Sequence, residues 1–311
     1  MLKIKCMKKT YHLCLSAGDE VMFRDLEDYH RGFNCFALAL YKTDSTGLVE
    51  SFMSTHTHQM AQTQCPKDLV YHFRRNYSLY FNHKYQREGR LGEMMHFSAE
   101  IVGYNHTLAA MSYVLRNAVH HGVVPIPYAY PHSSANAIFR EEMGKMQQTD
   151  LLSPKSYYRY IGKAVEYPER YKMHKSGVFL RESVLDIPQV EGLYGTPRAF
   201  NYFMTRKSSE EWIHEQTRDN VELPSMTLES IEKGVSMQDL DKMLMFENGK
   251  ANYRCVSDIE LCTEVDMIAR NIYGKHSVYQ LTVQEQRQLA EELYQKYKIS
   301  PVRIRRCLVM K

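Results

Sequence analysis

The sequence lacks the features that would assign the chain to a membrane, secreted or metal-thiolate class. No apolar run approaches about 18 residues, so no segment is expected to cross a membrane. The first residues lack the continuous apolar stretch of a signal peptide. The seven cysteines are odd in number and form no Cys-x-x-Cys pair, which argues against a disulfide framework and against a zinc site. We therefore expect a soluble cytoplasmic protein with free thiols.

A strong net charge is also missing. The 40 basic and 36 acidic residues give a formal net charge of +4 over 311 residues, so overall charge does not indicate a polyanionic partner. Tryptophan occurs once, whereas tyrosine occurs 23 times against 12 phenylalanines. Tyrosines stack on nucleic-acid bases or fill half-buried strand faces, and the second role is the more common one. Local patterns must therefore carry the functional argument.

Clear strand and helix patterns follow one another up to residue 140, which predicts a first domain over residues 1–140. The first helix pattern is interrupted near Gly32. Strand, helix, strand, strand, helix, strand, helix is the order of an α+β fold, a ferredoxin-like antiparallel sheet covered by helices. The patterns predict strands at 10–16, 48–53, 56–62 and 95–102, and helices at 23–41, 66–85 and 105–120.

The middle of the chain is less regular. Residues 141–235 are interrupted by prolines and predict no definite fold, apart from short helical patterns at 200–204 and 210–213. We treat this segment as an extension of the first domain.

The last part, residues 236–311, is expected to be mainly helical. Thr282 and Glu285 form a capping-box pattern, and Ser300-Pro301 starts a second, basic helix. A helix, a short turn and a basic helix are typical of a helix-turn-helix, although an ordinary helical hairpin with a solvated basic face fits equally well.

Two histidines, His56 and His58, lie two residues apart in a predicted strand. Successive strand side chains point to opposite faces, so both imidazoles point the same way and can bind one divalent metal ion. A bare His-x-His is more often two surface histidines on an edge strand. Tyr113 and Asn117, however, share one face of a predicted helix. If that face packs on the strand, two imidazoles, an amide oxygen and a phenol converge, a partial shell for Mg²⁺ or Mn²⁺ beside a nucleophile.

Four short segments, in order along the chain, carry a family resemblance. They resemble motifs of the single-tyrosine HUH transposases, in particular the REP-associated tyrosine transposases related to insertion-sequence transposases, and they cover residues 10–140. The segments are Met-Ser-Thr-His-Thr-His at 53–58, Tyr-Phe-Asn-His-Lys-Tyr at 80–85 with Gly-Arg-Leu at 89–91, Tyr-Val-Leu-Arg-Asn-Ala-Val at 113–119, and Tyr-Pro-His-Ser-Ser at 130–134.

The resemblance implies a metal-dependent single-stranded DNA endonuclease and strand transferase. Tyr113 would attack a DNA phosphodiester and form a 5′-phosphotyrosine. His56, His58 and Asn117 would hold Mg²⁺ or Mn²⁺. The expected partner is single-stranded or hairpin DNA, and the sequence leaves a monomer and a homodimer both open.

Four positions depart from the family pattern and keep a second interpretation open. A related protein that binds a DNA hairpin or repeat without cutting it fits these departures. A phosphoesterase with two His-x-Thr/Ser motifs is disfavoured, because the histidine pair itself reads His-Thr-His. The departing residues are Thr57 for a bulky apolar residue, Ala118 for proline, His120 near an expected arginine, and His132 for tryptophan.

Basic residues interleaved with tyrosines in the helix at 66–85 and the loop after it suit a single-stranded DNA backbone and its bases. A packed aromatic face with solvated charges is the alternative. The residues expected to contact DNA are Arg74, Arg75, Lys84, Arg87, Arg90, Arg116, Arg303, Arg305 and Arg306.

Overall fold

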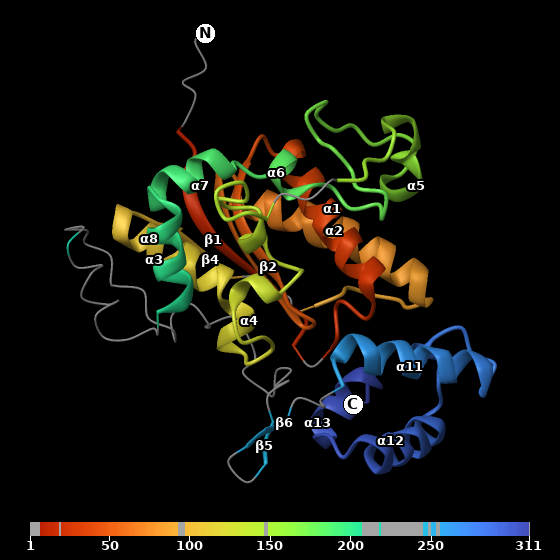
Figure 1. Ribbon diagram of the computed structural model, residues 1–311. Helices are drawn as coiled ribbons and strands as arrows, with labels where there is room; N and C mark the ends of the chain where they lie inside the picture. The colour runs from red at the N-terminus through yellow and green to blue at the C-terminus, as the bar shows by residue number, and fades with distance from the viewer. Residues whose placement is uncertain are drawn as a thin grey trace.

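The computed structural model describes residues 7–18, 20–92, 97–145, 149–206, 218, 245–247, 250–252 and 256–310. Its centre is an antiparallel sheet in the order β2-β3-β1-β4. With helices after β1 and β3, the chain forms the ferredoxin-like arrangement and confirms the predicted α+β class (Figure 1). The elements are β1 (Lys9–Ser16), α1 (Leu26–Lys42), β2 (Thr46–Phe52), β3 (His56–Thr63), α2 (Pro66–Tyr85) and β4 (Phe97–Ile101).

The two faces of the sheet are covered by different helices. Thr57 of β3 lies opposite both Leu15 and Phe52, and the ring of Phe52 packs against Phe36 of α1 and Phe73 of α2. The other face meets α3 (Tyr104–Leu115) and α4 (Asn117–His120). Figure 1 shows α1 and α2 on one side of the sheet and α3 on the other. The histidine pair therefore faces α3 and α4.

Helix α1 is continuous, so the predicted interruption at Gly32 is wrong. Asp25 caps the helix by accepting a hydrogen bond from the backbone of Asp28. A Cβ atom at Gly32 would lie 2.5 Å from Cε1 of Phe23. Glycine occurs here because an aromatic ring packs directly on the helix backbone, and not because the helix breaks.

The helix predicted at 105–120 is instead two helices. Arg116 ends α3 and precedes α4 with φ −95° and ψ 4°, and its N–H bonds to the carbonyl groups of both Ser112 and Tyr113. The strand predicted at 95–102 is observed as β4, and its first predicted residues fall in 93–96, outside the described residues.

The described part of the extension packs on the sheet unit. Phe179, Leu185 and Phe200 belong to the same hydrophobic core as the sheet residues. The pattern at 200–204 is confirmed as part of α8, whereas 210–213 lies outside the described residues. The short helices after α4 are η1 (Pro127–Ala129) and η2 (Ser134–Asn136), before the extension, and η3 (Pro154–Ser156), α5 (Tyr158–Ile161), α6 (Arg181–Val184), α7 (Ile187–Tyr194) and α8 (Pro197–Thr205) within it.

Residues 256–310 form a helical unit with its own core, built on Leu261, Leu289 and Ile304. The capping box of Thr282 and Glu285 is confirmed at the start of α12. The sequence prediction missed α11, although Ser257 and Glu260 form a capping box there too. The elements of the C-terminal part are β5 (Met245–Glu247), β6 (Lys250–Asn252), α11 (Asp258–Asn271), η5 (Val278–Gln280), α12 (Val283–Tyr297) and α13 (Pro301–Cys307).

Buried polar contacts join the helical unit to the sheet unit. Arg24 Nε lies 2.9 Å from Asp266 Oδ2, and its Nη1 donates to the carbonyl of Cys307. Ser54, in the turn between β2 and β3, donates to Asp258 at 2.8 Å. The helical unit is thus anchored two residues from His56. Among the described residues, no helix is long and apolar enough to span a membrane.

Candidate metal and tyrosine site

Both histidines of the pair are fully buried in an inner strand. β3 lies between β2 and β1, so the interpretation of His56 and His58 as edge-strand surface residues is wrong. Thr57 points to the opposite face, as expected from strand alternation. Its departure from the family pattern therefore concerns packing against α1 and α2 and leaves the histidine face unchanged.

His56 is held at both ring nitrogens. Its Nδ1 lies 3.1 Å from Thr55 Oγ1, and its Nε2 lies 3.2 Å from Asn117 Oδ1. The contact to Asn117 joins the β3 strand to the first residue of α4. Because the Nε2 faces an oxygen that is itself a metal donor, the ring is directed toward the predicted ligand set.

His58 is held at one ring nitrogen. Its Nδ1 lies 2.9 Å from Nε2 of His12, and the two rings stack with centroids 5.0 Å apart. Its Nε2 is buried and has no hydrogen-bond partner among the described residues. The sequence reasoning missed His12. The signal was present, because His12 lies in the predicted first strand at even spacing from Cys14, which pairs with His58.

Tyr113 and Asn117 meet despite the break at Arg116. Asn117 Nδ2 donates to Tyr113 Oη at 3.5 Å. The Tyr113 ring lies edge-on to His58, with centroids 5.4 Å apart, and stacks on His120 at 5.1 Å. The structure therefore brings together all four residues that the sequence singled out for metal binding and nucleophilic attack.

Burial keeps these imidazoles neutral. It lowers the pKa of His56 and of His58 well below the usual value, and the charge of neighbouring histidines lowers both further. Burial also lowers the pKa of His12 to about 4. Neutral imidazole is the form that binds a metal ion.

The donor set fits a divalent ion only if the amide is counted. No group of three His, Cys, Asp or Glu side chains with metal-binding geometry occurs in the part of the chain that the structure describes. His56 Nε2 and Asn117 Oδ1, however, are 3.2 Å apart. Two ligands at about 2.1 Å from an octahedral ion, set at right angles, lie about 3 Å apart. With the buried, unpartnered Nε2 of His58 as a third donor, the three residues match part of such a shell.

The cluster is closed to solvent. Tyr113 is 2% exposed, and His56, His58 and Asn117 are 0% exposed. His121, directly after α4, packs edge-on to His56 with ring centroids 5.2 Å apart. A phosphodiester therefore cannot reach the phenol in this conformation of the protein.

Two of the cations predicted to contact DNA are paired with acids. Lys84 Nζ lies 2.7 Å from both carboxylate oxygens of Asp25 and 2.9 Å from Asp28. Arg87 binds Glu20 through two nitrogens, at 2.8 and 2.9 Å. These pairs link the end of α2 to the segment before α1 and to the first turn of α1. Both side chains therefore stabilise the fold.

For Arg303 and Arg306 the prediction of DNA contact does not fit the structure. Both side chains are 5% exposed and pair with Asp258, which also accepts from Ser54. Being three apart on α13, they share the face that turns inward. Arg116 is also largely buried, and its Nη1 donates to the carbonyl of Phe203 at 3.5 Å.

The other predicted cations lie nearer to solvent. Arg75, Arg90 and Arg305 are exposed, and Arg74 is half-buried. The pKa of Arg74 is lowered by partial burial and then by the like charge of Arg90, so these two guanidinium groups are neighbours. Two adjacent cations favour an anion between or over them.

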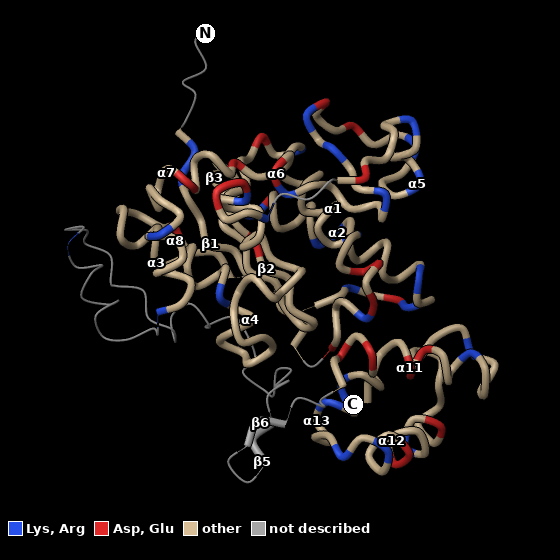
Figure 2. The backbone as a smooth tube through the Cα atoms, viewed as in Figure 1, with Lys and Arg blue, Asp and Glu red and all other residues tan. Residues whose placement is uncertain are grey.

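The helical unit has a nearly balanced charge. Residues 256–310 contain eight basic and seven acidic residues, a net charge of +1. Figure 2 shows mainly acidic residues on α11, both signs on α12 and only basic residues on α13. The helices of the predicted helix-turn-helix are present as α12 and α13, and three of their cations, Lys296, Arg303 and Arg306, are paired with acids.

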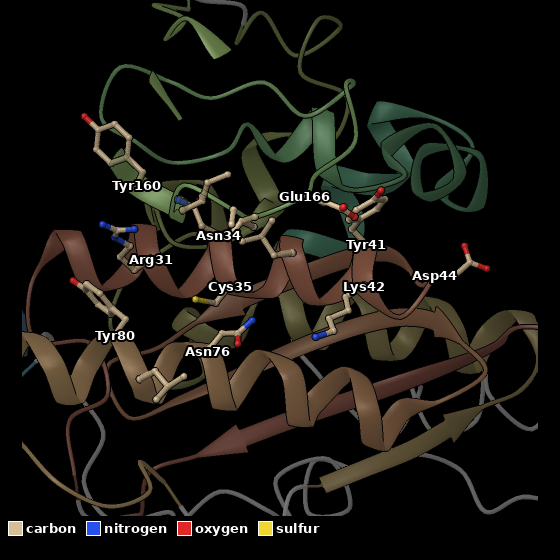
Figure 3. A pocket seen from close by; sticks show the side chains of 15 residues that line it. Arg31, Asn34, Cys35, Tyr41, Lys42, Asp44, Asn76, Tyr80, Tyr160 and Glu166 are labelled. Atoms are coloured by element: carbon tan, nitrogen blue, oxygen red, sulfur yellow. The ribbon is translucent and has the colours of Figure 1, made fainter. Parts of the chain in front are cut away.

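A cavity of about 880 Å³ lies away from the histidines, between α1, α2 and residues 160–166 (Figure 3). Its charged lining is balanced, with Arg31 and Lys42 against Asp44 and Glu166. Such a lining does not favour a polyanion. The cavity is therefore a poor candidate for DNA, and the histidine cluster is the better functional site.

Comparisons with known proteins do not assign the chain to a family. No protein-family model matches the chain. No curated protein matches it either. One solved structure that it resembles is that of a REP-associated tyrosine transposase bound to a REP hairpin, with 10% sequence identity and a TM-score of 0.36 over 47% of this chain and 85% of that one. A similarity at this level does not transfer a function.

Proposed function

We propose that the chain is a metal-dependent single-stranded DNA endonuclease and strand transferase, a transposase that uses Tyr113 as its nucleophile. The observation that supports this proposal is the convergence of Tyr113, Asn117, His56 and His58 in one cluster. These residues come from two motifs that lie about 55 residues apart in the sequence. Both motifs resemble those of the single-tyrosine HUH transposases.

His56, His58 and Asn117 would hold Mg²⁺ or Mn²⁺. Such an ion, when bound, polarises the scissile phosphate and offsets its developing charge. Asn117 has a second role, because its Nδ2 donates to the phenol oxygen of Tyr113. A hydrogen bond to that oxygen stabilises the phenolate over the phenol. One amide thus connects the ligand set to the nucleophile.

The reaction conserves the number of phosphate ester bonds. Tyr113 Oη forms a bond to phosphorus as the bond from phosphorus to O3′ breaks, and the phenol loses its proton while the departing 3′ oxygen gains one. The product is a 5′-phosphotyrosine that another 3′-hydroxyl attacks in the reverse sense. Strand transfer therefore needs no nucleotide cofactor.

The DNA would be single-stranded or folded as a hairpin. Among the predicted cations, Arg75, Arg90 and Arg305 are exposed and would contact phosphates.

The test is covalent capture of labelled single-stranded DNA, scored as an adduct that survives denaturing electrophoresis. Wild-type protein with Mn²⁺ is expected to form the adduct, and Tyr113→Phe is expected to lose it. Tyr104→Phe is the matched control, because Tyr104 is on the same helix but is 54% exposed and bonds to the carbonyl of Leu193. An adduct that persists in Tyr113→Phe would remove Tyr113 as the nucleophile.

A second function is favoured by the burial of the cluster. A site whose four residues are at most 2% exposed suits a protein that binds DNA hairpins without cutting them. This alternative predicts hairpin binding by wild-type protein, no adduct with any divalent ion, and unchanged binding in Tyr113→Phe. The same samples therefore decide between the two functions.

A further inference from the structure

His12 has a place in the cluster that the family resemblance does not assign. It is 0% exposed, and its Nε2 lies 2.9 Å from Nδ1 of His58. The ring also lies edge-on to Phe97 and to Tyr113, with centroids 5.6 and 6.5 Å away. His12 is therefore confined on several sides, and its contact with His58 has a fixed geometry.

The contact between His12 and His58 has two tautomeric forms. In one, His58 carries its proton on Nδ1 and donates it to His12, which leaves the Nε2 lone pair of His58 for a metal ion. In the other, His12 donates, and the proton of His58 sits on Nε2, where it blocks metal binding. His12 also cannot be a ligand through Nε2, because that atom faces His58.

His56 and His58 each have a partner at Nδ1. Thr55 Oγ1 lies 3.1 Å from Nδ1 of His56, and His12 Nε2 lies 2.9 Å from Nδ1 of His58. In both rings the Nδ1 has a partner and the Nε2 faces the cluster, where that of His56 lies 3.2 Å from Asn117 Oδ1 and that of His58 has no hydrogen-bond partner among the described residues. Partners of this kind fix the tautomer and orientation of metal-binding histidines.

We propose that His12 is a positioning residue that accepts the Nδ1 proton of His58 and so presents the Nε2 lone pair of His58 to the metal ion. This inference rests on the proposed function, since it assumes that His58 is a ligand. It assigns to β1 a contribution to metal affinity that the histidine pair alone does not explain.

The test measures Mn²⁺ binding by electron paramagnetic resonance, without DNA. His12→Phe keeps a ring and removes the acceptor, and it is expected to weaken Mn²⁺ binding by about 10- to 100-fold. His12→Gln places an amide oxygen near the position of Nε2 and is expected to restore most of the affinity. His106→Phe is the control, because His106 is a buried histidine of α3 that bonds to the carbonyl of Val102.

The outcomes separate this inference from the proposed function. If wild-type protein does not bind Mn²⁺, the metal assignment fails, and the role of His12 fails with it. If wild-type protein binds and His12→Phe binds equally well, only the role of His12 is overturned. Equal loss in His12→Phe and His12→Gln, with both folded by circular dichroism, also overturns it, because the acceptor would then not matter.

A measurement on the unmodified protein covers the case in which His12→Phe does not fold. ¹⁵N chemical shifts of the imidazole nitrogens, recorded with diamagnetic Mg²⁺, report the tautomer of each ring. We expect His58 to carry its proton on Nδ1 and His12 Nε2 to be unprotonated. A proton on His12 Nε2 in the loaded protein would refute the inference.

Discussion

Asp258 is the contact point between the helical unit and the turn that precedes His56, and its replacement tests how the two units are joined. The residue is 0% exposed, and its carboxylate accepts from Ser54 at 2.8 Å, from Arg303 at 3.2 Å and from Arg306 at 3.0 Å. Both guanidinium groups are 5% exposed. Asp258→Ala would leave two buried positive charges without their shared counter-charge.

The expected loss is large because the partners remain buried. Removing one member of a buried ion pair costs about 3–5 kcal/mol of unfolding free energy. The loss should fall first on residues 256–310, which then detach from the sheet unit and become sensitive to protease. Urea denaturation gives the free energy, and limited proteolysis followed by mass spectrometry locates the opened segment.

The control is Glu264→Ala on the same helix. Glu264 pairs with Lys296, whose side chain is 57% exposed, and accepts from Tyr297 Oη, so the expected loss is about 1–2 kcal/mol. If Asp258→Ala loses no more than Glu264→Ala, the buried cluster does not hold the units together and the reasoning fails.

Two further predictions concern buried polar groups of the sheet unit. Burial, followed by the charge of Asp25, raises the pKa of Asp28 from 3.8 to about 6, so the folded state binds a proton more readily than the unfolded state. Asp28 therefore contributes up to about 3 kcal/mol of unfolding free energy below about pH 4, and this contribution is lost as the pH rises to about 6. The difference in unfolding free energy between wild-type protein and Asp28→Asn, measured by urea denaturation, should therefore change over that pH range. A constant difference would contradict this. Thr57 Oγ1 is buried without a hydrogen-bond partner among the described residues, so Thr57→Val should raise the unfolding free energy by about 1 kcal/mol. The substitution should leave Mn²⁺ affinity unchanged. Urea denaturation and Mn²⁺ electron paramagnetic resonance check the two values, and a loss of affinity would place Thr57 in the site.

Local patterns predicted the order of elements in the sheet unit because their hydrophobic periods differ. A period of two over 56–62 and a helical period over 66–85 are both observed, the second with the predicted bounds. The interruption assigned to Gly32 was wrong for a non-local reason. The ring of Phe23 packs on the helix at this point, and no helix propensity reports that contact.

The basic C-terminal helix shows the same limit of prediction from local sequence patterns. Its cations suggested a DNA-binding surface, but Arg303 and Arg306 turn inward to Asp258, a residue 45 and 48 positions away. Charge along a sequence does not tell which face of a helix is buried, because burial depends on the partner element. α11 supplies that partner, and its capping box was present in the sequence but was not used.

The sequence by itself determined which side chains of the site point to the same face of their strand or helix. Strand alternation directed His56 and His58 to one face, and the i,i+4 spacing directed Tyr113 and Asn117 to another. Only the tertiary structure decided that these two faces meet, that His12 joins them from β1, and that the cluster is closed to solvent. The reason is that strand order and register, which place residues far apart in sequence at hydrogen-bond distance, depend on long-range packing that no local period encodes.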